Sequence, residues 1–165
     1  MQNNQIMMST AVVAKRRANG KIVWLLVKQT EDEDWNFPRT TARKGESSVR
    51  AAIRMMGELG GMNARVIEEV GKQSGTTVIN NRPTPKRLLY YVMIQKFGGE
   101  IIGFKDYKWF EVTEALKKLS NKKDKEALKK AKKELTLWLG DKPKRKAEEE
   151  KEALEALAAE EAGAK

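Results

Sequence analysis

Glu46, Arg54 and Glu58 bring two carboxylates and a guanidinium group together within 13 residues of this chain. They lie in the stretch GESSVRAAIRMMGELGG, which occupies residues 45–61. Carboxylate oxygens bind hard divalent cations such as Mg²⁺, and a guanidinium group pairs with carboxylates or phosphates. The spacing is nearly that of a helix that holds magnesium against a pyrophosphate. We therefore take Glu46 and Glu58 as candidate metal ligands, and all three residues as candidate catalytic residues.

The elements that must position these residues follow from the apolar pattern. Strands are expected at 9–17, 21–29, 64–70, 88–97 and 107–112, and Asn19-Gly20 predicts a hairpin between the first two. Ser47 or Ser48 can cap a helix that runs to Leu59. Further helices are expected from Thr113 and over 122–139, whereas residues 73–87 are predicted to form an exposed loop. The order of elements predicts an α+β fold, a mixed α/β sandwich in which helices flank a central mixed sheet.

Composition limits the chemistry and suggests the partners. The chain has no cysteine and no histidine, which excludes thiolate metal sites, imidazole bases and Cys–His nucleophiles. The net charge of +10 is uneven, because residues 1–140 carry +12 and residues 141–165 carry −2. We expect a domain over 1–140 and a charged, Ala/Glu-rich helical or disordered tail over 141–165. No apolar run is long enough to cross a membrane, so we expect a cytoplasmic protein whose partners are polyanions.

Residues 37–62 resemble the signature segment of the Nudix family. That signature is a Gly, five residues, a Glu, seven residues, Arg-Glu, an aliphatic residue, any residue, Glu-Glu, any residue, Gly and an aliphatic residue. The matching positions are Glu46, Arg54, Met56, Glu58, Gly61 and Met62. Thr40 takes the place of the first Gly, and Met55 and Leu59 take the places of two of the three helix glutamates. The resemblance implies a Nudix fold with a degenerate metal site.

The likeness extends beyond the signature segment. LLVKQ at 25–29, WNFPR at 35–39 and the run from 105 to 131 are similar to the diadenosine-polyphosphate-hydrolase-like branch of the family, so the resemblance covers about residues 9–139. In such proteins Mg²⁺ or Mn²⁺ bridges the pyrophosphate and positions the attacking water. A further base often lies on a later loop, where Gly103 stands here, with Asp106 as the nearby acid. Arg54 is expected to pair with a carboxylate and to brace the loop.

A basic and aromatic set surrounds the expected cleft. The candidate phosphate-binding residues are Arg39, Arg43, Lys44, Arg82, Lys86 and Arg87, and the candidate base-stacking residues are Tyr90 and Tyr91. Guanidinium groups suit phosphates, and a tyrosine ring can stack on a base. The alternative for each residue is a solvated cation or a core tyrosine.

Three functions are consistent with these residues. The first is a protein that binds nucleotide or RNA phosphates without efficient hydrolysis, in a ribonucleoprotein for example. The second is an active Mg²⁺-dependent hydrolase of a nucleoside-diphosphate-linked or dinucleoside polyphosphate substrate. The third is a protein-interaction module that docks through the 141–165 tail. The oligomeric state is left open by the sequence.

Overall fold

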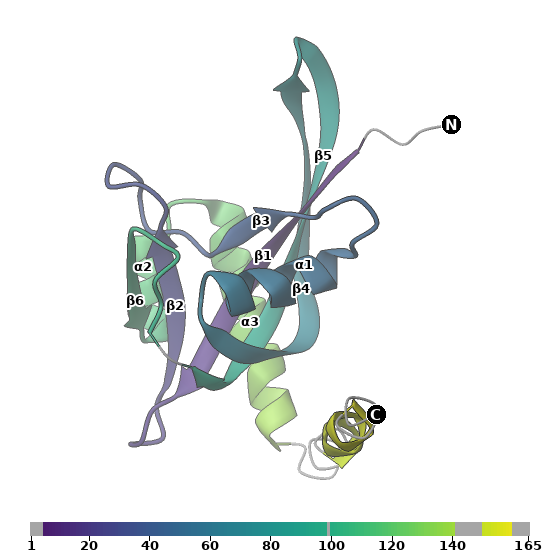
Figure 1. The fold of residues 1–165 in the computed structure, drawn as a ribbon. Coiled ribbons are helices and arrows are strands. Elements are labelled where there is room, and N and C mark those ends of the chain that lie inside the picture. The colour runs from purple at the N-terminus through teal and green to yellow at the C-terminus, as the bar shows by residue number, and fades with distance from the viewer. Residues whose placement is uncertain (1–4, 99, 141–149, 160–165) are drawn as a thin grey trace.

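The computed structural model describes residues 5–98, 100–140 and 150–159. The strands are β1 (Ile6–Arg16), β2 (Ile22–Lys28), β3 (Arg39–Thr41), β4 (Met62–Ile79), β5 (Arg82–Gly98) and β6 (Asp106–Phe110), and the named helices are α1 (Ser48–Glu58), α2 (Val112–Lys118) and α3 (Lys122–Gly140). The sheet order is β4-β5-β1-β2-β6, with β3 paired to β1 (Figure 1). The β1–β5 pair is parallel and the other pairs are antiparallel. The predicted mixed sandwich is confirmed.

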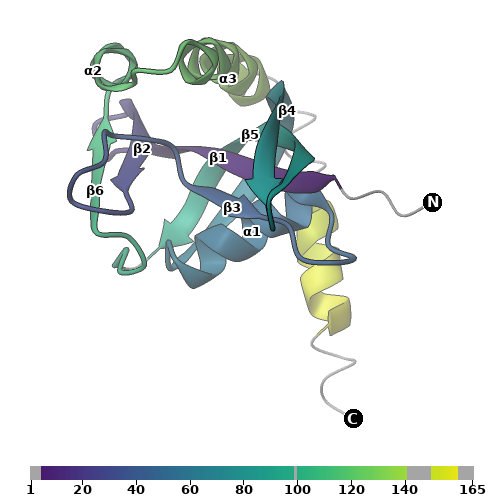
Figure 2. The same cartoon turned by 90° about the horizontal axis from the view of Figure 1, so that it is seen from above.

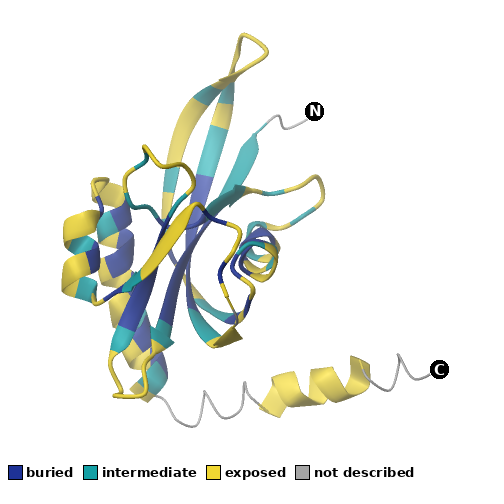
Figure 3. Ribbon diagram, turned by 60° about the vertical axis from the view of Figure 1, so that its left-hand side comes forward, coloured by how far each residue is buried: buried dark blue, intermediate teal, exposed yellow. Residues whose placement is uncertain are grey.

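Two hydrophobic cores lie on the two faces of the sheet. Because side chains alternate along a strand, Val12 of β1 points to one face and Ala11 and Val13 point to the other. Helices α2 and α3 cover the first face, and α1 covers the second (Figure 2). The colouring by burial follows this layering, with buried residues along the sheet and the inner sides of the helices (Figure 3). The sheet therefore separates α1 from α3.

The predicted hairpin between the first two strands is confirmed. Strands β1 and β2 pair in antiparallel register, with Ala14 opposite Trp24. Gly20 has a φ of +85°, which is the left-handed conformation that glycine adopts without a Cβ clash. The Asn19 side chain accepts a hydrogen bond from the backbone of Lys21 at 3.1 Å and so stabilises the turn.

The predicted exposed loop at 73–87 is wrong. Strands β4 and β5 continue through it and pair from Gly71 opposite Tyr90 to Ile79 opposite Arg82, and this antiparallel extension projects beyond the body of the molecule (Figure 1). We call residues 71–87 the β4–β5 ribbon. Asn80 and Asn81, with φ of 52° and 64°, form its turn, since asparagine tolerates left-handed backbone. Prolines are accommodated at 83 and 85 because β5 pairs with β1 only from residue 86 onward, which leaves an open edge there.

The C-terminal helices follow the predicted pattern with small shifts. Helix α2 begins at Val112, two residues earlier than expected, with Glu111 rather than Thr113 at its cap position. Helix α3 packs its apolar stripe on the sheet, and its buried residues are Asp124, Ala127, Leu128, Ala131, Leu135 and Trp138. Residues 150–159 are helical and exposed, while 141–149 and 160–165 lie outside the described residues, so the domain boundary at 140 stays a prediction. Among the described helices, none is long and apolar enough to cross a bilayer.

Candidate functional site

The N-terminus of α1 is fixed to the sheet by serines. Ser47 caps the helix by accepting a hydrogen bond from the Arg50 backbone N–H at 3.3 Å. The hydroxyl of Ser9, which is fully buried in β1, donates to the Ser48 carbonyl, and the Ser48 hydroxyl hydrogen-bonds the Tyr91 hydroxyl. Buried hydroxyls need such partners, so these bonds set the helix at one position on the sheet. The loop that precedes α1 is thereby held over the same face.

Glu46 is the centre of a closed set of hydrogen bonds in that loop. Arg54 donates to both of its carboxylate oxygens, from Nε at 2.8 Å and from Nη2 at 3.0 Å. The backbone N–H of Arg43 donates to Oε1 at 3.0 Å, and Arg54 Nη2 also donates to the Thr41 carbonyl at 3.3 Å. Hydrogen bonds from Arg54, then that from Arg43, lower the pKa of Glu46 to about 2. The pairing that the sequence implied for Arg54 is present, and it joins β3, the loop and α1.

This arrangement predicts how a Glu46→Gln variant responds to pH. The pKa of Glu46 is about 2 in the folded chain, against an ordinary value of 4.5. A lowered pKa contributes stability above the ordinary value, and that contribution is lost as the pH falls toward the folded value. We expect the stability difference between wild type and the variant to be constant above about pH 5.5 and to shrink toward pH 2. Urea unfolding over this range measures it, and a difference independent of pH would contradict the pairing.

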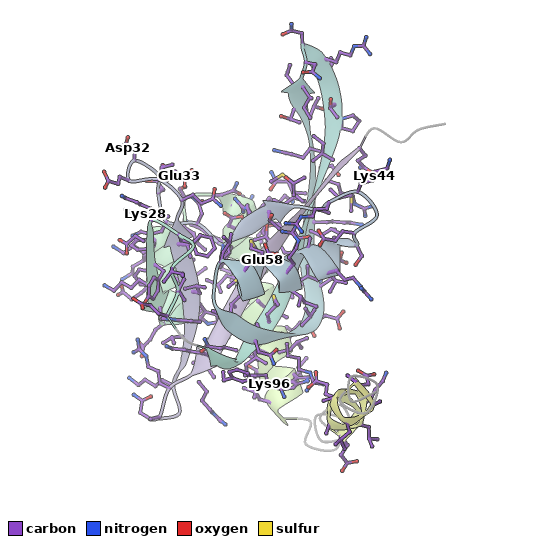
Figure 4. All side chains as sticks on the ribbon, in the orientation of Figure 1. Lys28, Asp32, Glu33, Lys44, Glu58 and Lys96 are labelled. Carbon is purple, nitrogen blue, oxygen red and sulfur yellow. The ribbon has the colours of Figure 1, made fainter. Side chains whose placement is uncertain are left out.

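Glu58, the second candidate metal ligand, stands at the other end of α1 (Figure 4). Its side chain is 55% exposed and lies between two guanidinium groups, with Oε2 at 3.8 Å from Arg43 Nη2 and 3.7 Å from Arg54 Nη1. Met55 and Leu59, which stand where the Nudix signature has two further glutamates, carry no charge. Met55 is 1% exposed in the core under the helix, and Leu59 packs against the same core. Glu46 and Glu58 are therefore the acidic groups that this helix and its loop offer.

These residues do not fit a divalent cation. Mg²⁺ requires near-octahedral oxygen ligation, yet each of the two carboxylates already faces arginine, and the two guanidiniums balance their charge. Within residues 5–98, 100–140 and 150–159, no three acidic side chains converge so as to hold a metal ion. Asp106, the acid expected to help, lies at the start of β6 opposite Lys28 and accepts from the Tyr107 N–H at 2.8 Å. Gly103 packs on α1 instead, donating its N–H to the Leu59 carbonyl at 3.0 Å.

Arg39 and Tyr90 lie on the opposite face of the sheet. Arg39, Thr10 and Tyr90 are neighbours on three adjacent strands, β3, β1 and β5. Arg39 donates to Thr10 at 3.1 Å and forms an ion pair with Asp124 of α3, and the Tyr90 hydroxyl donates to Asp124 at 2.7 Å. Burial, then the bond to Asp124, raises the pKa of Tyr90. Asp124 was not predicted as a site residue, although its position on the apolar stripe of α3, four residues before Leu128, was a usable signal.

The predicted stacking rings are covered. Tyr90 is 1% exposed, so its ring has no free face for a base, and the expectation that it stacks is wrong in this structure. Tyr91 is 9% exposed, and its hydroxyl is engaged by Ser48. A tyrosine in the core was the alternative that the sequence left open for each ring. Strand alternation places the two rings in the two separate cores.

The predicted phosphate-binding residues fall into three groups. Arg43 and Lys44 lie on the loop before α1, where Figure 4 shows Lys44 at the outer end of that loop. Arg39 and Lys86 line a polar cavity of about 220 Å³ with Gln73, Ser74, Thr76 and Asn121 on the α3 side. Arg82 and Arg87 belong to the β4–β5 ribbon, with Arg82 beside its turn. The structure thus does not assemble the six cations into one site.

Comparison with known proteins identifies the class. A family model for the NUDIX domain matches residues 7–131. The chain therefore belongs to the Nudix family.

Several solved structures have a fold similar to that of this chain. A C. elegans Ap4A hydrolase in a binary complex is 21% identical with a TM-score of 0.62, over 79% of this chain and 98% of that chain. A NUDIX hydrolase from Nitrosomonas europaea is 16% identical with a TM-score of 0.56, over 76% and 87%. The NUDIX domain of Shewanella oneidensis NrtR, complexed with ADP ribose, is 15% identical with a TM-score of 0.54, over 79% and 88%. A search of curated proteins finds no match.

Proposed function

We propose that this Nudix-family protein binds the phosphates of a nucleotide at the loop before α1 and does not hydrolyse them efficiently. The observation that carries the proposal is that arginine side chains already contact both carboxylates, those of Glu46 and Glu58. Glu46 is held by three hydrogen bonds from Arg54 and the Arg43 backbone, and Glu58 faces the same two arginines. A metal ion would have to displace guanidinium groups from both. With Met55 in the core, too few oxygen ligands remain for Mg²⁺ or Mn²⁺.

Arg43 and Lys44 are the residues we propose as phosphate contacts. The Arg43 side chain is 65% exposed, and its distance of 3.8 Å to Glu58 is that of a weak surface ion pair. A phosphate offers the arginine shorter, charge-assisted hydrogen bonds, so the side chain can turn toward a ligand. Two observations support a nucleotide as that ligand: the net charge of +12 over residues 1–140, and the complex of the NrtR NUDIX domain with ADP ribose. The same charge supports RNA as an alternative polyanion.

A second candidate function is metal-dependent hydrolysis. The Ap4A hydrolase and NUDIX hydrolase structures that this fold resembles favour it. The activity would then be hydrolysis of a nucleoside-diphosphate-linked or dinucleoside polyphosphate substrate. Glu46 and Glu58 would have to carry the metal after Arg43 and Arg54 move away from them. Binding and turnover together separate the two candidates.

Calorimetric titration tests the binding site. We expect ADP ribose or a dinucleoside polyphosphate to bind in the presence of EDTA, because arginine and lysine rather than metal neutralise the phosphates. The double variant Arg43→Ala, Lys44→Ala is expected to bind at least about tenfold more weakly, since two charged contacts are lost. The matched control is Lys129→Ala, Lys130→Ala on the exposed face of α3, which removes the same charge. Binding that requires added Mg²⁺, or that falls equally in both variants, would contradict the proposal.

A further inference from the structure

The β4–β5 ribbon is an exposed basic element that the proposed function does not use. Its 17 residues, GKQSGTTVINNRPTPKR, contain no acidic residue and four cations, Lys72, Arg82, Lys86 and Arg87. No ion pair joins any of these four to another residue in the described part of the chain. Figure 1 shows the turn end of the ribbon projecting beyond the body of the molecule. A charged projection of this kind attracts a polyanion.

The shape of the ribbon selects a double helix over a single strand. Four residue pairs extend past the first β1–β5 pair, from Thr76 opposite Pro85 to Ile79 opposite Arg82. At about 3.4 Å per pair this part is roughly 14 Å long, which exceeds the depth of the B-DNA major groove. That groove admits a two-stranded β-ribbon, whereas the major groove of A-form RNA is too narrow. The ribbon has no aromatic ring, and binding of single strands relies on aromatic stacking.

The side chains at the turn are of the kinds that contact base edges in DNA. Asparagine hydrogen-bonds adenine and arginine hydrogen-bonds guanine in the major groove, and Asn80, Asn81 and Arg82 are consecutive exposed residues there. Val78 and Ile79 are 69% and 44% exposed, although they are apolar. Apolar side chains contact the methyl group of thymine, which RNA lacks. Lys86 and Arg87 lie four and five residue pairs from the Ile79–Arg82 pair at the turn, roughly 14 and 17 Å away, whereas Lys72 lies seven pairs away. From the first two positions a long side chain can reach the phosphates at the mouth of a groove about 8.5 Å deep.

We propose that the β4–β5 ribbon binds double-stranded DNA, with its Asn80–Arg82 turn in the major groove and Lys86 and Arg87 on the phosphates. This interaction uses a different surface from the nucleotide site on the loop before α1. The two proposals can therefore fail separately. A ribbon variant that loses DNA must still bind nucleotide.

Fluorescence anisotropy of the full chain with a labelled 20-base-pair DNA duplex tests the proposal. Two phosphate contacts, from Lys86 and Arg87, predict a slope of about −2 for log K against log salt. The variant Arg82→Ala, Lys86→Ala, Arg87→Ala removes both of these contacts and one base contact, so it is expected to bind at least about tenfold more weakly, with the slope reduced by about two. The control Lys129→Ala, Lys130→Ala, Lys133→Ala has the same net charge and should keep wild-type affinity. If the half-buried Arg87 is needed for folding, the pair Arg82→Ala, Lys86→Ala replaces the triple variant.

Measurements with an RNA duplex and with single-stranded DNA test whether the ribbon prefers double-stranded DNA. An RNA duplex of the same sequence and the single DNA strand are expected to bind at least about tenfold more weakly than the DNA duplex, because the ribbon reads a wide major groove. Equal or tighter binding of RNA would overturn the assignment to DNA. Absence of wild-type binding at 50 mM salt, or equal losses in the ribbon and control variants, would overturn the ribbon as the contact surface.

Discussion

Replacing Asp124 by alanine is expected to lower the free energy of unfolding by about 3 kcal/mol. The Asp124 side chain is 1% exposed, and it holds two groups, the Arg39 guanidinium and the Tyr90 hydroxyl. The Arg39 side chain is only 23% exposed. The variant leaves the guanidinium poorly solvated and without its carboxylate partner, and it leaves the hydroxyl with only its 3.3 Å bond to the Gln73 side chain. That loss costs more than the pair itself contributes. Because Asp124 comes from α3 and Arg39 from β3, the loss also loosens the helical layer from the sheet.

A surface acid on the same helix provides the control for this prediction. Glu126 is 53% exposed and faces Lys123 at 3.8 Å, so Glu126→Ala should change stability by no more than about 0.5 kcal/mol. Urea unfolding monitored by tryptophan fluorescence measures both variants. If Asp124→Ala matches Glu126→Ala, the buried pair does not join the two layers as described here.

Replacing Gly103 by alanine is expected to cost about 2 kcal/mol. A Cβ at this position would lie 2.5 Å from the Leu59 Cα and 2.7 Å from the Leu59 carbonyl oxygen. These are atoms of the backbone at the end of α1, which cannot move aside as a flexible side chain can. The loop cannot retreat easily either, because Ile101 and Phe104 on each side of Gly103 are buried in the core under α1.

Gly57 is the matched control, because it stands on α1 two residues before Leu59. A Cβ there meets nothing within 4 Å, and glycine within a helix is less favourable than alanine. Gly57→Ala should therefore stabilise the protein by about 0.5–1 kcal/mol. Thermal unfolding of the two variants should shift in opposite directions. A destabilised Gly57→Ala, or a neutral Gly103→Ala, would contradict the packing of the 101–104 loop on α1.

The sequence predicted those features that depend on neighbours along the chain. Helix α1 was predicted because Ser47 can cap it and its apolar residues repeat at helical spacing, and the first hairpin was predicted from Asn19-Gly20. The Glu46–Arg54 pair was implied by the family signature, which spans a single loop and helix. The order of such elements predicted the mixed α/β sandwich, and the family resemblance implied the Nudix fold.

The features that the sequence did not predict depend on register between distant strands. Arg39 and Tyr90 were expected around the cleft at the signature segment, but strand alternation points them to the face opposite α1. Only the β3–β1–β5 pairing determines that face. The sequence predicts a loop in place of the β4–β5 ribbon because Pro83, Pro85 and two asparagines are turn formers. Those prolines occur in a strand here because the edge beside them is open.

Hydrolysis of a panel of nucleoside polyphosphates and dinucleoside polyphosphates would show whether this chain is a metal-dependent hydrolase or only binds nucleotides. Purified wild type and the Glu58→Gln variant would be assayed with Mg²⁺ and with Mn²⁺. Because the Glu58 side chain is half-exposed, the variant should fold normally. Our account predicts no metal-dependent turnover above that of the variant, together with nucleotide binding by both proteins. Metal-dependent turnover by wild type that disappears in Glu58→Gln would contradict it and would establish the chain as a hydrolase.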